Sequence, residues 1–163
     1  MKDLGADNLV YLAQAIQVKY ERPKANQLLQ AGDLIFRSRG QAHTAALLCE
    51  EVADAILAAP LFRVRPNLKK VLPEYLLWWI NQNSSQCYFA SQAKGTAVQM
   101  VSKQSLDNLE VKLPSIDQQH KIVEFFKLSI EEQRLLEKIK EHKVRYAQGV
   151  LMQMASKARI GRK

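Results

Sequence analysis

The sequence has few of the residues that build disulfide or metal-bound frameworks. Two cysteines, Cys49 and Cys87, and three histidines occur in 163 residues. The cysteines are far apart and do not form a C-x-x-C pair, and the histidines are scattered. The chain therefore lacks zinc-ligand spacing and the disulfide framework of a small secreted protein. We expect two reduced, buried thiols, no bound metal and no cofactor.

Long apolar segments are absent as well. The sequence contains no run of 18 or more apolar residues, which a transmembrane helix would need. It also has no stretch with the pattern of a signal peptide. With 47% hydrophobic residues, the chain can still build one ordinary core. We expect a soluble, cytoplasmic protein with one domain, an appendage and no membrane partner.

The motifs of the obvious DNA enzymes are also missing. A methyltransferase needs a glycine-rich cofactor loop after a strand and an aromatic–proline motif, and neither is present. A nuclease needs clustered carboxylates to hold a metal. The acidic residues that adjoin apolar runs are spread along the chain, at Asp33, Asp54, Glu74 and Asp107. These absences count against a catalytic nuclease or methyltransferase. The residues leave open a small nuclease or methyltransferase accessory protein, and a coiled-coil adaptor that does not bind DNA.

Positive charge is abundant by contrast. The chain has 24 Lys+Arg against 16 Asp+Glu, a net charge of +8 at pH 7, and this balance favours polyanionic partners. Some of the excess lies in the basic tail of residues 158–163, where a solvated terminus would have the same composition. Net charge alone therefore does not establish nucleic-acid binding.

Short apolar runs fill residues 33–65, and they favour strands over helices: "DLIF", "AALLC", "AILAA" and "LFRVR". The section "AALLCEEVADAILAA" also permits a helix, but Gly40 before it and Pro60 after it favour strands. In "GDLIFRSRG", Arg37 and Arg39 are two residues apart and point to the same side of an extended chain. We expect an acidic partner for them, either inside the protein or outside it.

Helices and one further strand are predicted over residues 73–113. Pro73 stands at the first helical position of "PEYLLWWINQ". A second helix, "SSQCYFASQA", is expected to end with Gly95 in the C-terminal capping role. One helical turn at "SLDN" and a strand at "EVKLP" follow. We expect Trp78 and Trp79 to pack in the core rather than stack on bases.

The last third of the sequence predicts one long helix. Pro114 ends the preceding strand, and Ser115 with Gln118 forms an S-x-x-Q capping box. From there to about Ser156, only Gly149 disfavours helix, by about 1 kcal/mol relative to alanine. Roughly 40 residues at 1.5 Å each give a rod of about 60 Å, and its apolar stripe needs a partner helix in a coiled coil. The candidate seam consists of Ile122, Phe126, Leu136, Ile139, Tyr146 and Val150, and Lys143 interrupts it.

Three stretches in this order resemble the specificity subunit of type I restriction-modification systems: "LLQAGDLIFRSRG", "PEYLLWWINQ" and "KGTAVQMVSKQSLDNLEVKLPSIDQQHKIVEFF". The resemblance implies an α/β fold of the α+β kind, in which a small mixed or antiparallel sheet with short helices precedes a long C-terminal coiled-coil helix. It also implies a target recognition domain over residues 1–113, lacking an N-terminal segment usual in the family. A conserved spacer helix over 114–157 and the basic tail complete the expected organisation.

The resemblance implies a function too. A specificity subunit reads double-stranded DNA without catalysis of its own, and positions the modification (methyltransferase) subunit and, through the complex, the restriction subunit. The loops of its recognition domain face DNA. The residues expected there are Arg37, Arg39, Gln41, His43, Lys69, Lys70, Lys94, Thr96, Gln99 and Lys103. Arginine contacts phosphate or, bidentately, guanine, and an internal ion pair is a third possibility for Arg37 and Arg39.

A partner helix is also implied. Specificity subunits usually pair two spacer helices, whereas this chain has one. We therefore expect a homodimer through the C-terminal helix, with the two copies antiparallel and Lys143 of one copy beside Glu132 or Glu137 of the other.

Overall fold

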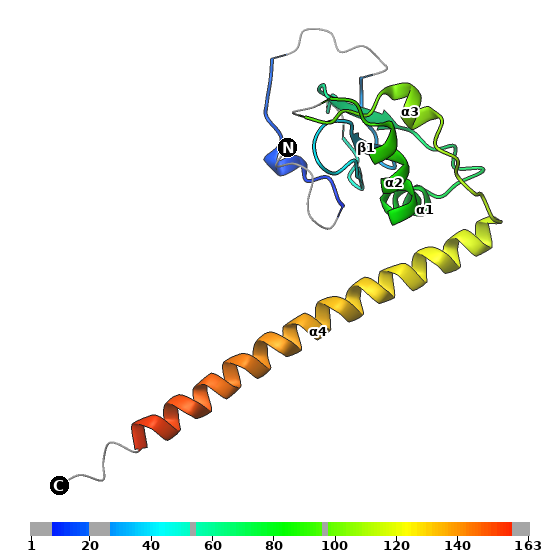
Figure 1. The fold of residues 1–163 in the computed structure, drawn as a ribbon. Coiled ribbons are helices and arrows are strands. Elements are labelled where there is room, and N and C mark those ends of the chain that lie inside the picture. The colour runs from blue at the N-terminus through cyan, green and yellow to red at the C-terminus, as the bar shows by residue number, and fades with distance from the viewer. Residues whose placement is uncertain (1–7, 20–26, 53–54, 96–97, 158–163) are drawn as a thin grey trace. The chain divides into compact units, whose positions relative to one another are not determined.

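A computed structural model describes residues 8–19, 27–52, 55–95 and 98–157 (Figure 1). The elements in chain order are η1 (Leu12–Gln14), β1 (Leu34–Arg37), β2 (Ala45–Leu47), β3 (Leu61–Val64), α1 (Pro73–Asn81), α2 (Asn83–Gln92), α3 (Lys103–Asp107) and α4 (Ile116–Lys157). The chain divides after Val123 into two units. The predicted α+β class is confirmed.

The sheet of the first unit has three antiparallel strands in the order β2–β1–β3. Leu34 lies opposite Leu47 on one side and opposite Val64 on the other. The strands expected from "DLIF" and "LFRVR" are confirmed. The ambiguous alanine-rich section has no helix in its described residues, 45–52 and 55–59; it contributes β2, and Ile56 forms a single bridge with Leu28.

The central strand β1 is buried on both faces. Leu34 and Phe36 belong to the cluster that includes Tyr75 and Phe89 of α1 and α2. Ile35 faces the other way, into a second cluster with Val10, Leu29, Ala46 and Leu48. A strand covered on both faces needs a continuous apolar run, and "LIF" supplies it.

Helix α1 begins at Pro73, as expected, and packs its tryptophans against the first cluster. Trp78 and Trp79 are partly buried beside Tyr75, with ring centroids 5.6 and 6.1 Å from the Tyr75 ring. Trp79 Nε1 also donates a hydrogen bond to the Glu110 carbonyl oxygen, 3.1 Å away. The core role predicted for both tryptophans is confirmed.

Two local predictions are wrong. Helix α2 ends at Gln92 with Ala93 as its extended C-cap, so Gly95 does not cap it. Gly95 instead has φ +120, a conformation that favours glycine, and an added Cβ would lie 2.5 Å from the Val98 carbonyl oxygen.

The segment "EVKLP" is not a strand either. Side chains of α1 satisfy its carbonyl groups in place of a neighbouring strand: Trp79 bonds to Glu110, and the Tyr75 hydroxyl donates to the Lys112 carbonyl oxygen at 2.6 Å. Its alternating apolar residue Val111 packs on the core all the same. Burial raises the pKa of Tyr75, which favours the protonated hydroxyl that donates this bond.

The long helix α4 is confirmed at full length. Ser115 Oγ accepts a hydrogen bond from the Gln118 amide at 3.3 Å, which is the serine half of the predicted capping box. Gln119, in its first turn, is fully buried. Its side chain accepts from the Leu72 amide and donates to the Lys70 and Pro114 carbonyls, at 2.9, 3.0 and 2.9 Å. Every side chain from 131 to 149 is exposed.

Two sequence expectations concern absent features, and a third concerns the cysteines; all three can be compared with the described residues. No described helix has an apolar stretch long enough to cross a bilayer. No described group of three His, Cys, Asp or Glu side chains is placed to share a metal ion. Cys49 and Cys87 are not joined in a disulfide, but both are exposed, so the expectation of buried thiols is wrong. Cys87 lies on the outer side of α2, and Cys49 follows β2 and the buried Leu48.

Candidate nucleic-acid interface

An acidic residue beside β1 pairs with an arginine, but that arginine is Arg65 and not one of the two in "RSRG". Asp33, fully buried before β1, accepts hydrogen bonds from Arg65 Nε at 2.6 Å and from Arg65 Nη2 at 2.7 Å. The second carboxylate oxygen also accepts from the Gln30 amide at 2.9 Å. The hydrogen bond to Asp33 raises the pKa of Arg65. The antiparallel register of β1 and β3 continues to place Arg65 opposite Asp33, which is why this arginine finds the acid.

The opposite end of β1 leads to the surface. Ser38 is fully buried and its hydroxyl donates to the Pro60 carbonyl oxygen, whereas Arg37 is half-buried and Arg39 is exposed. This alternation agrees with the prediction that the two arginines share a side. Among the described residues, no acidic side chain pairs with Arg39. The acidic residues that follow β2, Glu50 and Glu51, are both exposed.

A short backbone ladder joins the two segments expected to face DNA. The Gly40 amide donates to the Gln99 carbonyl at 3.1 Å, and the Val101 amide donates to the Ser38 carbonyl at 2.8 Å. Arg39 is thereby bridged to Met100, and Met100 is bridged in turn to Lys94. Directly opposite residues in antiparallel pairs place their side chains on the same face. Arg39, Met100 and Lys94 therefore form one exposed row, which we call the cationic edge.

The remaining candidates fall into three groups. Gln41 and Gln99 are exposed and lie within two residues of the cationic edge, and Lys103 is exposed at the start of α3. Thr96 lies outside the described residues. Lys69 and Lys70 are exposed in a turn whose Lys70 carbonyl bonds to Gln119. That turn follows Arg65, at the Asp33 end of β1, so the structure does not bring these lysines to the cationic edge.

His43 does not belong to this surface. Its side chain is 3% exposed, and Nδ1 lies 3.3 Å from the Arg37 carbonyl oxygen. Its own carbonyl accepts from Gln86 Nε2 at 3.0 Å. A ring buried in this way cannot reach DNA from where it lies, so we remove His43 from the interface. The sequence shows its polarity but not its burial.

Helix α4 exposes an apolar stripe that differs in part from the expected seam. Ile122 packs against the core of the first unit, and Phe126 is half-buried one turn later, so we leave both out of the proposed seam. Phe125 and Leu128 are 76% and 70% exposed and continue the stripe at the same three- and four-residue steps. The revised candidate seam, a set of apolar residues along one side of the helix, consists of Phe125, Leu128, Leu135, Leu136, Ile139, Tyr146, Val150 and Met154.

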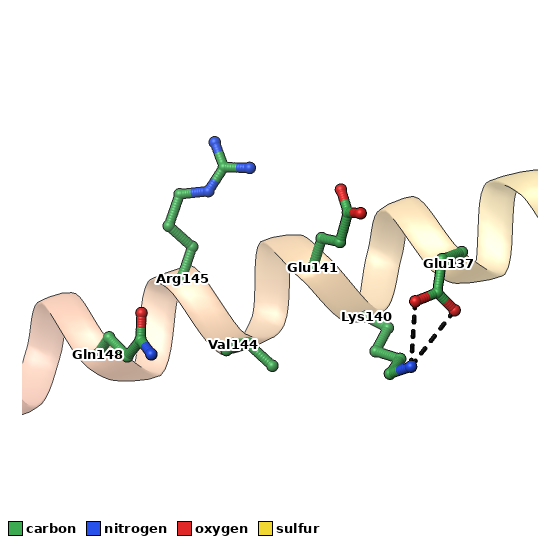
Figure 2. Close-up of a pocket in the computed structure, with 6 residues that line it drawn as sticks. All are labelled: Glu137, Lys140, Glu141, Val144, Arg145 and Gln148. Atoms are coloured by element: carbon green, nitrogen blue, oxygen red, sulfur yellow. Dashed lines mark hydrogen bonds and ion pairs between the residues drawn. The ribbon is translucent and has the colours of Figure 1, made fainter.

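Another side of α4 is polar and charged. Figure 2 shows Val144 with Glu137, Lys140, Glu141, Arg145 and Gln148 along the helix. Lys140 Nζ pairs with Glu137 Oε1 at 3.0 Å, and both side chains are well exposed. Because all six residues come from one exposed helix, this shallow depression is helix surface rather than a ligand cavity.

The fold and the edge define a class of protein: an α+β domain with a cationic edge, joined to a long amphipathic helix. The family model described as the type I restriction modification DNA specificity domain matches residues 8–142. The chain belongs to this family.

Two relatives agree with this assignment. The chain is similar to the type I restriction enzyme EcoBI specificity subunit of Escherichia coli, with 24% identity over 121 residues, which are 74% of this chain and 24% of that subunit. It also resembles the HsdS subunit crystal structure from Thermoanaerobacter tengcongensis, with a TM-score of 0.58 and 20% identity over 72% of this chain and 31% of that one. The latter likeness shows the fold alone. The chain spans less than a third of the length of either relative.

Proposed function

We propose that this protein is a DNA-recognition specificity subunit, with residues 1–113 as the recognition domain and 114–157 as the spacer helix. The observation that carries the proposal is the cationic edge, because it gathers Arg39 and Lys94 from segments distant in sequence on a member of the specificity family. DNA is the polyanion that this family's description names, and we take the double-stranded form to be the partner. The protein then acts in the cytoplasm without catalysis of its own.

The partners in this proposal are the modification subunit, the restriction subunit through the complex, and a second copy of the chain. The relative is the specificity subunit of a type I restriction enzyme, which supports the first two. The exposed seam of α4 supports the third, because it leaves large apolar side chains in water along most of the helix. Each copy would contribute one recognition domain, so the dimer would read a two-fold-symmetric site.

The DNA contacts can be tested by the salt dependence of binding. Each phosphate neutralised by a lysine or arginine contributes about 0.9 to the slope of log K against log salt concentration. We expect Arg39→Ala and Lys94→Ala each to lower that slope by about 1 in a titration with duplex DNA. Lys112→Ala is the matched control, because Lys112 is exposed and away from the cationic edge. Slopes unchanged in both edge variants would contradict the proposed interface.

Arg37 and Arg39 can also contact bases. If either does, its replacement by alanine costs about 1–3 kcal/mol of binding and relaxes the preference at one base pair. Thermal unfolding separates this from a structural role. Variants that bind like the parent but melt earlier would show that the two arginines serve the fold.

Lys69 and Lys70 remain proposed as non-specific phosphate contacts. They lie at the Asp33 end of β1, so DNA must extend beyond the cationic edge to reach them. Gln41, Gln99 and Lys103 border that edge and remain proposed DNA contacts, as does Thr96.

A further inference from the structure

An exposed methionine occupies the middle of the cationic edge. Met100 is 46% exposed, with Arg39 on one side of it and Lys94 on the other. Exposure to water does not stabilise an apolar methionine side chain, and neither core cluster includes Met100. An apolar residue framed by two cations indicates a contact with a partner that has charge on either side of an apolar group.

The spacing of the row follows from its hydrogen bonds. Lys94 and Met100 exchange both backbone bonds, at 3.0 and 2.9 Å, which makes them a hydrogen-bonded pair. Arg39 and Met100 lie between two ladder bonds and form a non-hydrogen-bonded pair. Such pairs have Cα atoms about 5.5 and 4.5 Å apart, so the two cations begin about 10 Å from each other. The major groove of B-DNA is about 12 Å wide.

This spacing lets the two cations reach phosphates on both sides of a major groove, with Met100 over the base edges between them. The base edges there carry hydrogen-bonding groups, and the thymine C5-methyl group is the apolar exception. A thioether neither donates nor accepts strongly, so it would leave the polar groups of other bases without partners. We propose that Met100 reads thymine through its methyl group, an inference that rests on the DNA-binding function proposed above.

The test uses deoxyuridine, which is thymidine without that methyl group. The full chain first selects its preferred sequence from a random duplex pool, and each thymine of that sequence is then replaced singly by deoxyuridine. We expect one replacement to weaken binding of the parent about fourfold, the equivalent of about 0.8 kcal/mol for one buried methyl. In Met100→Ala, the same replacement should leave the dissociation constant unchanged. Met100→Leu should keep the sensitivity, because it keeps an apolar side chain of similar volume.

Leu68→Ala is the matched control, since Leu68 is 67% exposed and lies in the turn beside Lys69. It should bind both duplexes as the parent does. Equal sensitivity in the parent and in Met100→Ala would overturn the assignment, as would a parent that ignores every thymine methyl or selects no sequence. In those cases the DNA-binding proposal still stands if Arg39→Ala and Lys94→Ala lower the salt slope. Unchanged slopes would overturn the interface itself.

Discussion

The double variant Leu136→Asp, Ile139→Asp is expected to sediment at 18.6 kDa, and the parent at twice that mass. Leu136 and Ile139 are 58% and 50% exposed in the single chain and lie mid-seam on α4. Losing one buried leucine or isoleucine from a packed interface costs about 2–5 kcal/mol, and the dimer loses four. Four losses at about 2 kcal/mol each come to about 8 kcal/mol, so the dissociation constant should rise by roughly five orders of magnitude or more.

The control places two aspartates elsewhere on the same helix. Val144 and Met152 are 52% and 72% exposed and lie off the seam, so Val144→Asp, Met152→Asp should remain dimeric. Analytical ultracentrifugation at tens of micromolar, together with circular dichroism for helix content, distinguishes the outcomes. A parent that is monomeric at that concentration would contradict the homodimer and leave the seam to another partner, such as the modification subunit.

In the proposed dimer, charged residues on the same side of the helix as the seam favour an antiparallel pair. When the two-fold axis crosses between Glu137 and Lys138, Leu136 of one copy faces Ile139 of the other, and Glu132 faces Lys143. A parallel pair in register would instead set each of these charges opposite its own copy. We expect Glu132→Lys and Lys143→Glu each to weaken the dimer and the double swap to restore it. If the double swap is no better than the single changes, this register is wrong.

The second large effect concerns stability. Arg65→Met is expected to lower the free energy of unfolding by about 2–4 kcal/mol, since it leaves the fully buried Asp33 carboxylate with one hydrogen-bond partner, the Gln30 amide. The value is set below that of a wholly buried pair because the Arg65 side chain is 37% exposed and water weakens its attraction. Denaturant unfolding measures the effect as a lower midpoint with an unchanged m-value.

Arg63→Met provides the comparison from two residues away on the same strand. Arg63 Nη1 donates to the Leu28 carbonyl oxygen at 2.6 Å but makes no described ion pair, so its loss should cost about 1 kcal/mol. Adding Asp33→Asn to Arg65→Met should recover part of the lost stability, because the buried charge is then removed. If Arg65→Met and Arg63→Met cost the same, the ion pair contributes little to the fold.

Sequence reasoning succeeded where a local pattern determines the structure. Pro73 marks the first turn of α1, the run "LIF" requires a strand, and the Ser115 cap starts a helix that nothing later interrupts. It failed where the partner is distant. The alternating residues of "EVKLP" do not indicate whether its carbonyl groups bond to a neighbouring strand or to side chains. Here they accept hydrogen bonds from Tyr75 and Trp79 of α1.

The candidate interface divides in the same way. The exposure of Arg39 follows from its place two residues beyond a buried strand. Its position beside Met100 rests on a pairing across some 60 residues of sequence, which no local pattern encodes. The pairing of Arg65 with Asp33 likewise depends on the register of β1 and β3. The sequence alone predicted an acidic partner for Arg37 and Arg39 instead. Burial of His43 required the packing of α2 against the turn before β2.

The ladder that carries the cationic edge is held by main-chain hydrogen bonds between residues 38–40 and 99–101 and between Lys94 and Met100. These bonds do not depend on which side chains the exposed positions bear, whereas the other end of β1 depends on Asp33, Arg65 and two buried clusters. Substitutions at positions 39, 94 and 100 should therefore alter what the surface binds at little cost in folding stability. The residues on which folding depends lie at one end of β1, and the exposed residues of the cationic edge lie at the other. What this surface binds could therefore change without changes in the core.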